Sequence, residues 1–248
     1  MNNRQTQIVE LLSQHHKMEV TELSELLKVS QVTIRKDLIQ LEQNGLILRE
    51  HGYATLNDSD DINHRLGNHF EAKQRIAKAC AKLIKDGETI MIESGSCCAL
   101  AAIEIAKTKK DVTIITNSAF IADYIRKTGN PKIVLLGGDY QLSSQVMVGP
   151  LVRQSVASFF VDKLFIGSDG LTPTAGFTGN DYMRAEAVRD MARQANKVFV
   201  VTDSSKFSKM GTVNLLPIDK IYGVITDTDI PSEYENYLNE KEVVLVKA

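Results

Sequence analysis

Residues 20–54 read VTELSELLKVSQVTIRKDLIQLEQNGLILREHGYA, and this stretch decides the fold of the N-terminal part of the chain. Ile34, Leu38 and Leu41 recur at positions i, i+4 and i+7, which predicts a helix with one apolar face. Ser30 directly precedes this helix and is placed to cap its N-terminus. Because another short amphipathic stretch precedes the turn at residues 28–30, the segment predicts a helix-turn-helix.

Two short β-prone runs, residues 46–49 and 53–56, follow on either side of a turn that contains glycine. A hairpin in this position is a wing, so we predict a winged helix-turn-helix domain over residues 1–56. The next stretch, residues 57–69 (NDSDDINHRLGNH), is polar and acid-rich with little periodicity. Such a composition predicts a linker.

The predicted helix after Ser30 turns a polar face away from its apolar core, and this face suits the major groove of DNA. Arg35 and Lys36 can reach guanine edges or phosphates, and glutamines can bind adenine or a phosphate. The candidate DNA contacts on this helix and in the wing are Ser30, Gln31, Val32, Thr33, Arg35, Lys36, Gln40, His51 and Tyr53. The alternative is a solvated face of a helical domain that docks another protein.

The charge of the N-terminal segment gives no general signature of a nucleic-acid-binding domain. Residues 1–56 hold six Lys or Arg and seven Asp or Glu, a net charge of −1, and the whole chain has a net charge of −2 at pH 7. The argument for DNA binding therefore depends on where the few positive side chains lie.

From residue 70 onward, apolar strand-like runs alternate with helix-like stretches, which predicts a parallel α/β sheet in a domain spanning residues 70–248. Polar and glycine-containing loops follow nearly every run: ESGSCC, TNS, GGDY, GSDG and DSSKF. In an open α/β sheet the carboxyl ends of the strands face one crevice, where ligands bind. One such loop is equally well an ordinary tight turn, but five of them predict a pocket. The predicted strands are residues 89–92, 112–115, 132–136, 163–167, 197–202, 220–226 and 243–246.

Nearly the whole chain, residues 4–227, resembles the DeoR family of bacterial transcription regulators. The N-terminal similarity lies in the turn VS, the helix core TIRKDL and the wing HGYA, and the C-terminal similarity in segments such as IESGSCCALA, TIITNSAFIA, DKLFIGSDGL and VTDSSKF. The resemblance implies an α/β sensor domain related to ribose-phosphate isomerases, which binds phosphorylated sugars. It also implies a transcription regulator, expected to repress a sugar-metabolism operon until such an effector binds.

The residues after the predicted strands fit a phosphate physically. The loop at residues 93–98 runs directly into a helix, so backbone N–H groups meet the positive end of the helix dipole. Lys206 is the candidate counter-charge, and Asn117 and Asp169 are the candidate partners of sugar hydroxyls. The candidate effector contacts are Ser94, Gly95, Ser96, Cys97, Asn117, Ser118, Gly138, Ser168, Asp169 and Lys206.

The three cysteines, Cys80, Cys97 and Cys98, lack both the number of a disulfide framework and the spacing of a metal site. We therefore expect no metal and no cofactor beside the effector. The adjacent thiols at 97 and 98, where the family often has threonines, leave redox or metal sensing as an alternative. With neither a run of roughly 20 apolar residues nor a signal-peptide core, the chain is expected in the cytoplasm, without a membrane partner.

A different function remains as the alternative, a sugar-phosphate isomerase with an appended DNA-binding domain. Proton transfer between adjacent carbons needs a carboxylate and a cation, which Asp169, Glu186, Asp203 and Lys206 can supply. The stretch 173–180, PTAGFTGN, has no Lys or Arg where the isomerases carry a basic loop, so we expect no enzyme. The expected partners are double-stranded operator DNA, a phosphorylated sugar and further copies of the chain, as a dimer or tetramer.

Overall fold

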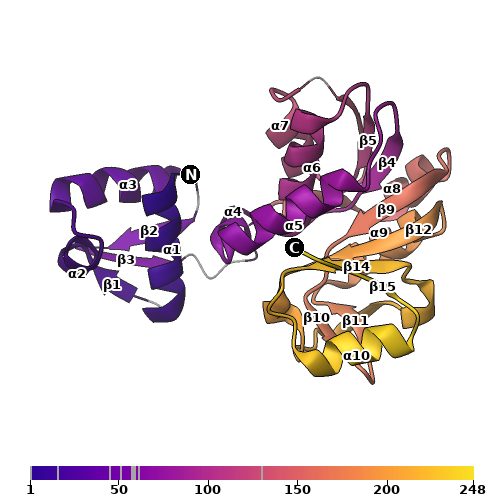
Figure 1. Ribbon diagram of the computed structural model, residues 1–248. Helices are drawn as coiled ribbons and strands as arrows, with labels where there is room; N and C mark the ends of the chain where they lie inside the picture. Colours follow the sequence, from indigo (N-terminus) through magenta and orange to yellow (C-terminus); the bar gives the residue numbers. More distant parts are fainter. Residues whose placement is uncertain are drawn as a thin grey trace. The chain divides into compact units, whose positions relative to one another are not determined.

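The computed structural model describes residues 2–15, 17–44, 46–50, 52–56, 60, 62–129 and 131–248. The chain divides into two compact units, Met1–Phe70 and Glu71–Ala248, whose elements are drawn in Figure 1. Each unit has a hydrophobic core of its own. Among the described residues, no helix combines the length and the apolar character needed to cross a lipid bilayer.

The first unit is the winged helix-turn-helix predicted from the sequence. Ile34, Leu38 and Leu41 are fully buried and share a core with Ile8 and Leu12. A strand that the sequence did not predict, β1, pairs antiparallel with β3, so that the wing has the order β1-β3-β2. The elements are α1 (Asn3–His15), β1 (Lys17–Glu19), α2 (Val20–Leu26), α3 (Gln31–Gln43), β2 (Ile47–Glu50), β3 (Tyr53–Leu56) and α4 (Ile62–Gly67).

The stretch predicted as a linker, residues 57–69, holds the helix α4 in its second half. Ile62 and Leu66 are 1% and 8% exposed, and a Cβ added to Gly67 would lie 2.8 Å from a methyl group of Val9 in α1. The structure differs from the prediction here because one apolar pair at i and i+4 does not stand out from a polar background. Residues 57–59 and 61 lie outside the described part of the chain.

The second unit is built on a seven-stranded parallel sheet, which confirms the predicted α/β class. Its spatial order is β15-β14-β12-β9-β4-β5-β6, so the direction of winding reverses between β4 and β9. The carboxyl ends of strands at such a reversal form the crevice that binds ligands in open α/β sheets. The strands are β4 (Thr89–Ile92), β5 (Thr113–Thr116), β6 (Lys132–Leu135), β9 (Val161–Ile166), β12 (Ala195–Val201), β14 (Gly223–Thr226) and β15 (Val244–Lys247).

Helices cover both faces of the sheet, and successive residues along each strand point to opposite faces. Val152 of α8 (Pro150–Val156), Val188 of α9 (Tyr182–Ala192) and Leu238 of α10 (Ser232–Glu240) share one core with Leu164 and Val200 of the sheet. The alternating residues Ile90 and Phe165 are also fully buried. Helices α5 (Phe70–Lys82), α6 (Ser96–Thr108) and α7 (Ala119–Ile125) are drawn beside β4 and β5 in Figure 1.

Several short strands in the connections were not predicted. They are three or four residues long, too short to give a clear alternation of apolar and polar residues. A hairpin is formed by β7 (Asp139–Gln141) and β8 (Val146–Val148), and a small antiparallel sheet by β10 (Gly170–Thr172), β11 (Gly176–Gly179) and β13 (Val213–Leu216).

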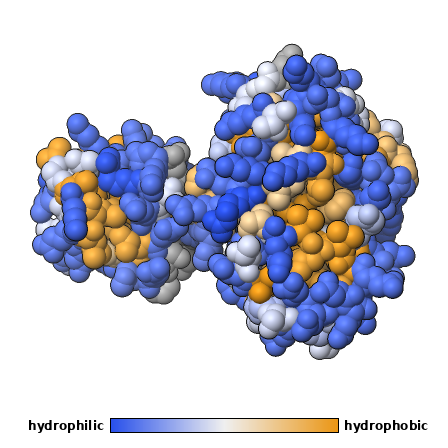
Figure 2. Space-filling model, in the orientation of Figure 1, coloured by the Kyte–Doolittle hydropathy of each residue, from blue (hydrophilic) through white to orange (hydrophobic). Residues whose placement is uncertain are grey.

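The surface seen in Figure 2 is mainly hydrophilic, with an apolar area in the region of β14 and β15.

Candidate functional site

The outward face of α3 is exposed, as its helical period predicts. Its start is capped by Ser30, whose Oγ accepts a hydrogen bond from the backbone N–H of Thr33 at 3.2 Å and lies 2.9 Å from the Thr33 hydroxyl. These two candidate DNA contacts therefore also stabilise the helix start. The exposed side chains of the face are Val32, Arg35, Lys36, Ile39, Gln40 and Gln43.

Two glutamines of α3 are held by neighbouring side chains. Gln5 of α1 donates through Nε2 to Gln40 Oε1 at 2.5 Å, and Arg35 Nη2 donates to Gln31 Oε1 at 3.4 Å. Because each carbonyl oxygen already accepts one hydrogen bond, the two N–H donors of the NH2 group are the larger part of what each side chain can offer to DNA. Phosphate oxygens and the acceptors of a guanine edge suit these groups better than adenine, which requires a donor and an acceptor together.

The wing tyrosine is held by β1. The Tyr53 hydroxyl hydrogen-bonds Glu19, which lowers the pKa of that carboxyl, and Lys17 Nζ lies 4.5 Å from the centre of the Tyr53 ring. Tyr53 is 37% exposed. One face of the ring is thus covered, so a contact with DNA would use its exposed edge or other face. His51, the other wing candidate, lies outside the described residues.

In the second unit, the loops after β4 and β9 meet where the winding reverses. Gly95 is the N-cap of α6 with φ 125° and ψ 155°, and a Cβ added there would lie 3.8 Å from the Cα of Gly167. Glu93 links the same loops, because its Oε2 accepts from the backbone N–H of Gly167 at 3.4 Å. The start of α6, with its free backbone N–H groups, therefore lies in the predicted crevice.

The loop after β12 joins this corner through Cys97. Burial raises the pKa of the Cys97 thiol to about 12. The positive charges of Lys73 and Lys206 lower this pKa, and the negative charge of Asp203 raises it. A backbone hydrogen bond from Asp203 also acts on the sulfur. The neighbouring strand contributes Asp227, whose Oδ2 accepts from the backbone N–H of Ser204 at 2.7 Å. Loops after β4, β9, β12 and β14 thus come together.

Lys73 is a further candidate site residue, one that was not predicted from the sequence. It lies in the first turns of α5, and only 3% of its surface is exposed. Its effect on Cys97 places its charge near the start of α6. The signal in the sequence was its position on the buried face of α5, four residues before Ala77 and seven before Cys80. A lysine at a core position usually has a charged or polar partner.

A further cation lies close to Glu93. Burial raises the pKa of Glu93 to about 6, while hydrogen bonds from Ser94 and Gly167 and the positive charge of Arg184 lower it. Ser94 Oγ donates to Glu93 Oε1 at 2.5 Å. Arg184 lies in the first turn of α9, and its side chain is 13% exposed. It was not among the predicted effector contacts.

The remaining candidate effector contacts serve local structure. Ser118 caps α7 by accepting from the N–H of Ile121 at 3.1 Å. Ser168 donates to the carbonyls of Gly170 and Thr178 and holds the turn after β9. At Gly138, a Cβ would lie 2.5 Å from the carbonyl oxygen of Val148, so glycine is needed there for packing against β8.

Asn117 is tied to the β7–β8 hairpin and not to the Lys206 loop. Its Nδ2 donates to the carbonyl of Met147 at 3.0 Å, and its buried Oδ1 has no partner among the described residues. The free atom is therefore an acceptor, suited to a hydroxyl donor. Asp169 accepts from the N–H of Asn180 at 3.0 Å and is half-buried.

Both units match known protein families. Residues 4–60 match the DeoR-like helix-turn-helix domain, and residues 68–228 match the DeoR C-terminal sensor domain. The chain belongs to the DeoR family. The predicted resemblance is confirmed, and this DeoR-family chain is a DNA-binding transcription regulator.

Relatives of this DeoR-family chain span nearly its whole length. The HTH-type transcriptional regulator GolR of Listeria innocua is 32% identical over 92% of this chain and 91% of its own. The putative aga operon transcriptional repressor of Escherichia coli O157:H7 is 30% identical over 99% of this chain and 94% of its own. Among solved structures, ribose 5-phosphate isomerase A from Methanocaldococcus jannaschii is similar with a TM-score of 0.43 and 23% identity, covering 57% of this chain and 56% of that one.

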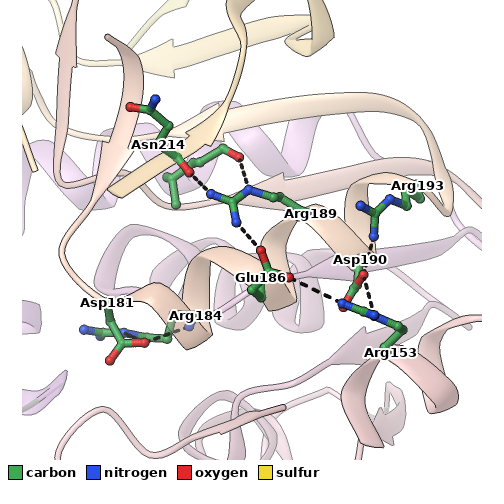
Figure 3. A network of polar contacts seen from close by, with 9 residues as sticks. Arg153, Asp181, Arg184, Glu186, Arg189, Asp190, Arg193 and Asn214 are labelled. Carbon is green, nitrogen blue, oxygen red and sulfur yellow. Dashed lines mark hydrogen bonds and ion pairs between the residues drawn. The ribbon is translucent and has the colours of Figure 1, made fainter. Parts of the chain in front are cut away.

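Glu186, the carboxylate considered for isomerase chemistry, forms ion pairs in this DeoR-family protein (Figure 3). It pairs with Arg189 and, at 3.4 Å, with Arg153, which also bonds Asp190 at 3.0 Å. Arg184, on the same helix, lies 3.8 Å from Asp181. Asp203 is likewise engaged, accepting from the N–H of Ser205 at 3.2 Å. Among the described residues, no group of three His, Cys, Asp or Glu side chains gathers closely enough to bind a metal ion.

The thiols bear on the alternative of redox sensing. Cys80, Cys97 and Cys98 are all buried and none of them is in a disulfide bond, and burial raises the pKa of both Cys80 and Cys97. Because the thiolate is the reactive form, Cys80 and Cys97 lack the low-pKa setting of a redox sensor, and all three thiols lack the exposed position. The structure favours their interpretation as small buried residues.

Arg35→Ala and Lys36→Ala are each expected to weaken binding to a duplex selected by the regulator from a random library. Both side chains are exposed on the outward face of α3, so the fold should be unaffected. A lost base contact costs about 1–3 kcal/mol and relaxes sequence preference, whereas a lost phosphate contact lowers the salt slope by about one. Gel-shift titration at fixed salt measures this, with Lys127→Ala in the second unit as the control. Unchanged affinity in both variants would remove α3 as the recognition helix.

Glu93→Gln is expected to stabilise the protein at neutral pH and not in acid. The pKa of Glu93 is raised from 4.5 to about 6, so the native state binds its proton more tightly than the unfolded state. The protonated Glu93 carboxyl therefore stabilises the native state. This stabilisation is complete below the pKa of 4.5 that the group has in the unfolded chain, and it is lost as the pH rises through about 6. Urea denaturation should show a gain of up to about 2 kcal/mol at about pH 8 and none near pH 4. The exposed Glu71→Gln is the control; an equal gain at both pH values would contradict this assignment.

Proposed function

We propose that this chain represses an operon of sugar metabolism and releases its operator when a phosphorylated sugar binds at the strand ends of the second unit. The observation that carries the proposal is the meeting of the α6 start with Lys73 and Lys206 around Cys97. A helix N-terminus with two nearby cations suits a phosphate. Because the Cys97 thiol stays neutral, it does not cancel the charge of the lysines.

The neighbouring groups suit the sugar part of such a ligand. Glu93, Asp203 and Asp227 are buried carboxylates, and Asn117 Oδ1 is a buried acceptor without a partner among the described residues. Hydroxyl groups are the donors that such acceptors require. The names of two relatives, the putative aga operon transcriptional repressor and the glycerol-3-phosphate regulon repressor, support a repressor that responds to a phosphorylated metabolite.

The same proposal holds that the chain is a regulator without catalytic activity or a cofactor. The absence of Lys and Arg from residues 173–180 and the ion pairs of Glu186 support it. We place its action in the cytoplasm, and we propose a dimer or tetramer, since two-fold operators are read by paired recognition helices. The effector must bind one of two states better, with a coupling of typically about 1–3 kcal/mol.

A thermal-shift screen of the full chain tests this function. Pentose, hexose and triose phosphates are each compared with the unphosphorylated parent. A true effector at about 100 times its dissociation constant adds about 2.7 kcal/mol to the free energy of unfolding, and its parent adds far less. The stabilising compound should then release the selected duplex in a gel shift. Stabilisation by no phosphorylated compound, or equally by the parents, contradicts phosphate sensing; interconversion of the sugar phosphates would favour the isomerase.

A further inference from the structure

Each flank of the recognition helix α3 holds an arginine through one of the helix's own carboxylates. On one flank, Arg4 of α1 donates from Nε to Asp37 Oδ2 at 2.5 Å. On the other, Arg49 of β2 bonds through Nη1 to Glu42 Oε2 at 3.4 Å, and its backbone N–H donates to Glu42 Oε1 at 3.3 Å. Neither arginine belongs to α3, yet both are fixed to it.

The two carboxylates mark the borders of the face that α3 turns to solvent. At 100° per residue, Asp37 and Glu42 lie about 140° apart around the helix axis across the buried side. The wider arc between them carries the exposed residues of the face. The Asp37 side chain is only 5% exposed, whereas those of Arg4 and Arg49 are 35% and 33% exposed. Each guanidinium is therefore anchored at one edge of the reading face and still reaches solvent.

Donors remain on both arginines after these pairs are formed. A guanidinium has five N–H donors, and among the residues that the structure describes Arg4 and Arg49 bond through their side chains only to Asp37 and Glu42.

The major groove is about 12 Å wide, close to the diameter of a helix with its side chains, and phosphates line both of its rims. A helix in the groove thus brings its two edges to the two rims.

We propose that Arg4 and Arg49 bind backbone phosphates on opposite rims of the groove, and that Asp37 and Glu42 are positioning residues that hold the guanidinium groups there. The proposal rests on DNA binding by the first unit and not on the operator sequence or the effector. It also accounts for a DNA-binding segment with a net charge of −1, because an arginine paired with a carboxylate adds donors without adding net charge.

The test uses the full chain and a duplex of mixed sequence, since a phosphate contact does not depend on the bases. Arg4→Ala and Arg49→Ala are each expected to weaken binding about tenfold at fixed salt and to lower the slope of log K against log salt by about one. Arg126→Ala breaks a comparable pair with Asp123 in the second unit and should bind as wild type. An unchanged slope in Arg4→Ala and Arg49→Ala would overturn the proposal.

Double variants separate phosphate binding from simple neutralisation of the carboxylates. Arg4→Ala with Asp37→Asn, and Arg49→Ala with Glu42→Gln, should stay well below wild type and keep the reduced slope. Full recovery would show that the arginines only compensate the two carboxylates, and the proposal would fall. Arg4→Gln keeps a donor for Asp37 without the charge, so it should show the same reduced slope, and it replaces Arg4→Ala if the alanine variant does not fold.

Arg35→Ala and Arg4→Ala, both titrated on the duplex selected by the regulator, separate this proposal from the assignment of α3 itself. If Arg35→Ala weakens binding and Arg4→Ala does not, only the flanking contacts are wrong. If Arg35→Ala, Lys36→Ala and Arg4→Ala all bind as wild type, the recognition helix is wrong and the proposal falls with it.

Discussion

Lys206→Ala is expected to remove most of the response to the effector while leaving DNA affinity unchanged. Lys206 acts on Cys97 at the start of α6, where we propose the phosphate binds. A hydrogen bond to a charged group contributes about 1.5–3 kcal/mol, so the loss in effector affinity should be about 10- to 150-fold. A ligand that no longer prefers one state cannot shift the population, and the variant should repress with the effector present.

Calorimetric titration with the phosphorylated sugar found in the screen, and with its parent, measures this loss. The matched control is Lys209→Ala, an exposed lysine three residues along the same loop, which should bind as wild type. Equal losses in both variants would indicate a general charge effect. Unchanged binding by Lys206→Ala would remove this lysine from the site, even if the chain still repressed.

Gly95→Ala is expected to abolish effector binding through the backbone alone. With φ 125° and ψ 155°, Gly95 occupies a region that is essentially restricted to glycine. Space is not the obstacle, because the nearest atom to an added Cβ would be the Gly167 Cα at 3.8 Å. The strain of about 1–3 kcal/mol is relieved by rotating the backbone at the helix start. The N–H groups then turn away from the phosphate, and the loss of two such bonds lowers affinity more than about a hundredfold.

Gly87→Ala is the matched control for this variant. Gly87 also has a positive φ, 74°, and an added Cβ there meets nothing within 4 Å, but it lies in a turn before β4. Both variants should lower the midpoint of thermal unfolding, and only Gly95→Ala should lose calorimetric effector binding. Retained binding by a folded Gly95→Ala would contradict a phosphate at the start of α6.

The elements that the sequence predicted well are those with a regular apolar pattern over several residues or with a recognisable capping residue. Ser30 and the Ile34, Leu38, Leu41 spacing predicted α3, and the apolar runs predicted the seven strands of the sheet, since a strand buried on both faces is almost continuously apolar. Strands of three residues, such as β1 and β7, lack that signal. They form because the chain around them brings a pairing partner alongside.

The candidate site could be predicted where loops follow strands and not where helices lie over those loops. The corner at Gly95 and the loop at Lys206 follow from the sheet, because all carboxyl ends of parallel strands face one edge. Lys73 and Arg184 come from helices, and a single sequence does not show which helix turn lies above which loop. Ser168 and Gly138 look the same in sequence as ligand contacts, but local packing accounts for both.

The buried cysteines make the protein suitable for labelling. With the pKa of the Cys97 thiol at about 12, fewer than about one molecule in ten thousand carries a thiolate there at neutral pH, and the burial of Cys80 and Cys98 keeps reagents from them. A cysteine placed on the exposed face of α3, and another on α10, would therefore react with maleimide dyes against a nearly silent background. Energy transfer between such dyes would report directly how the distance between the two units responds to DNA and to effector.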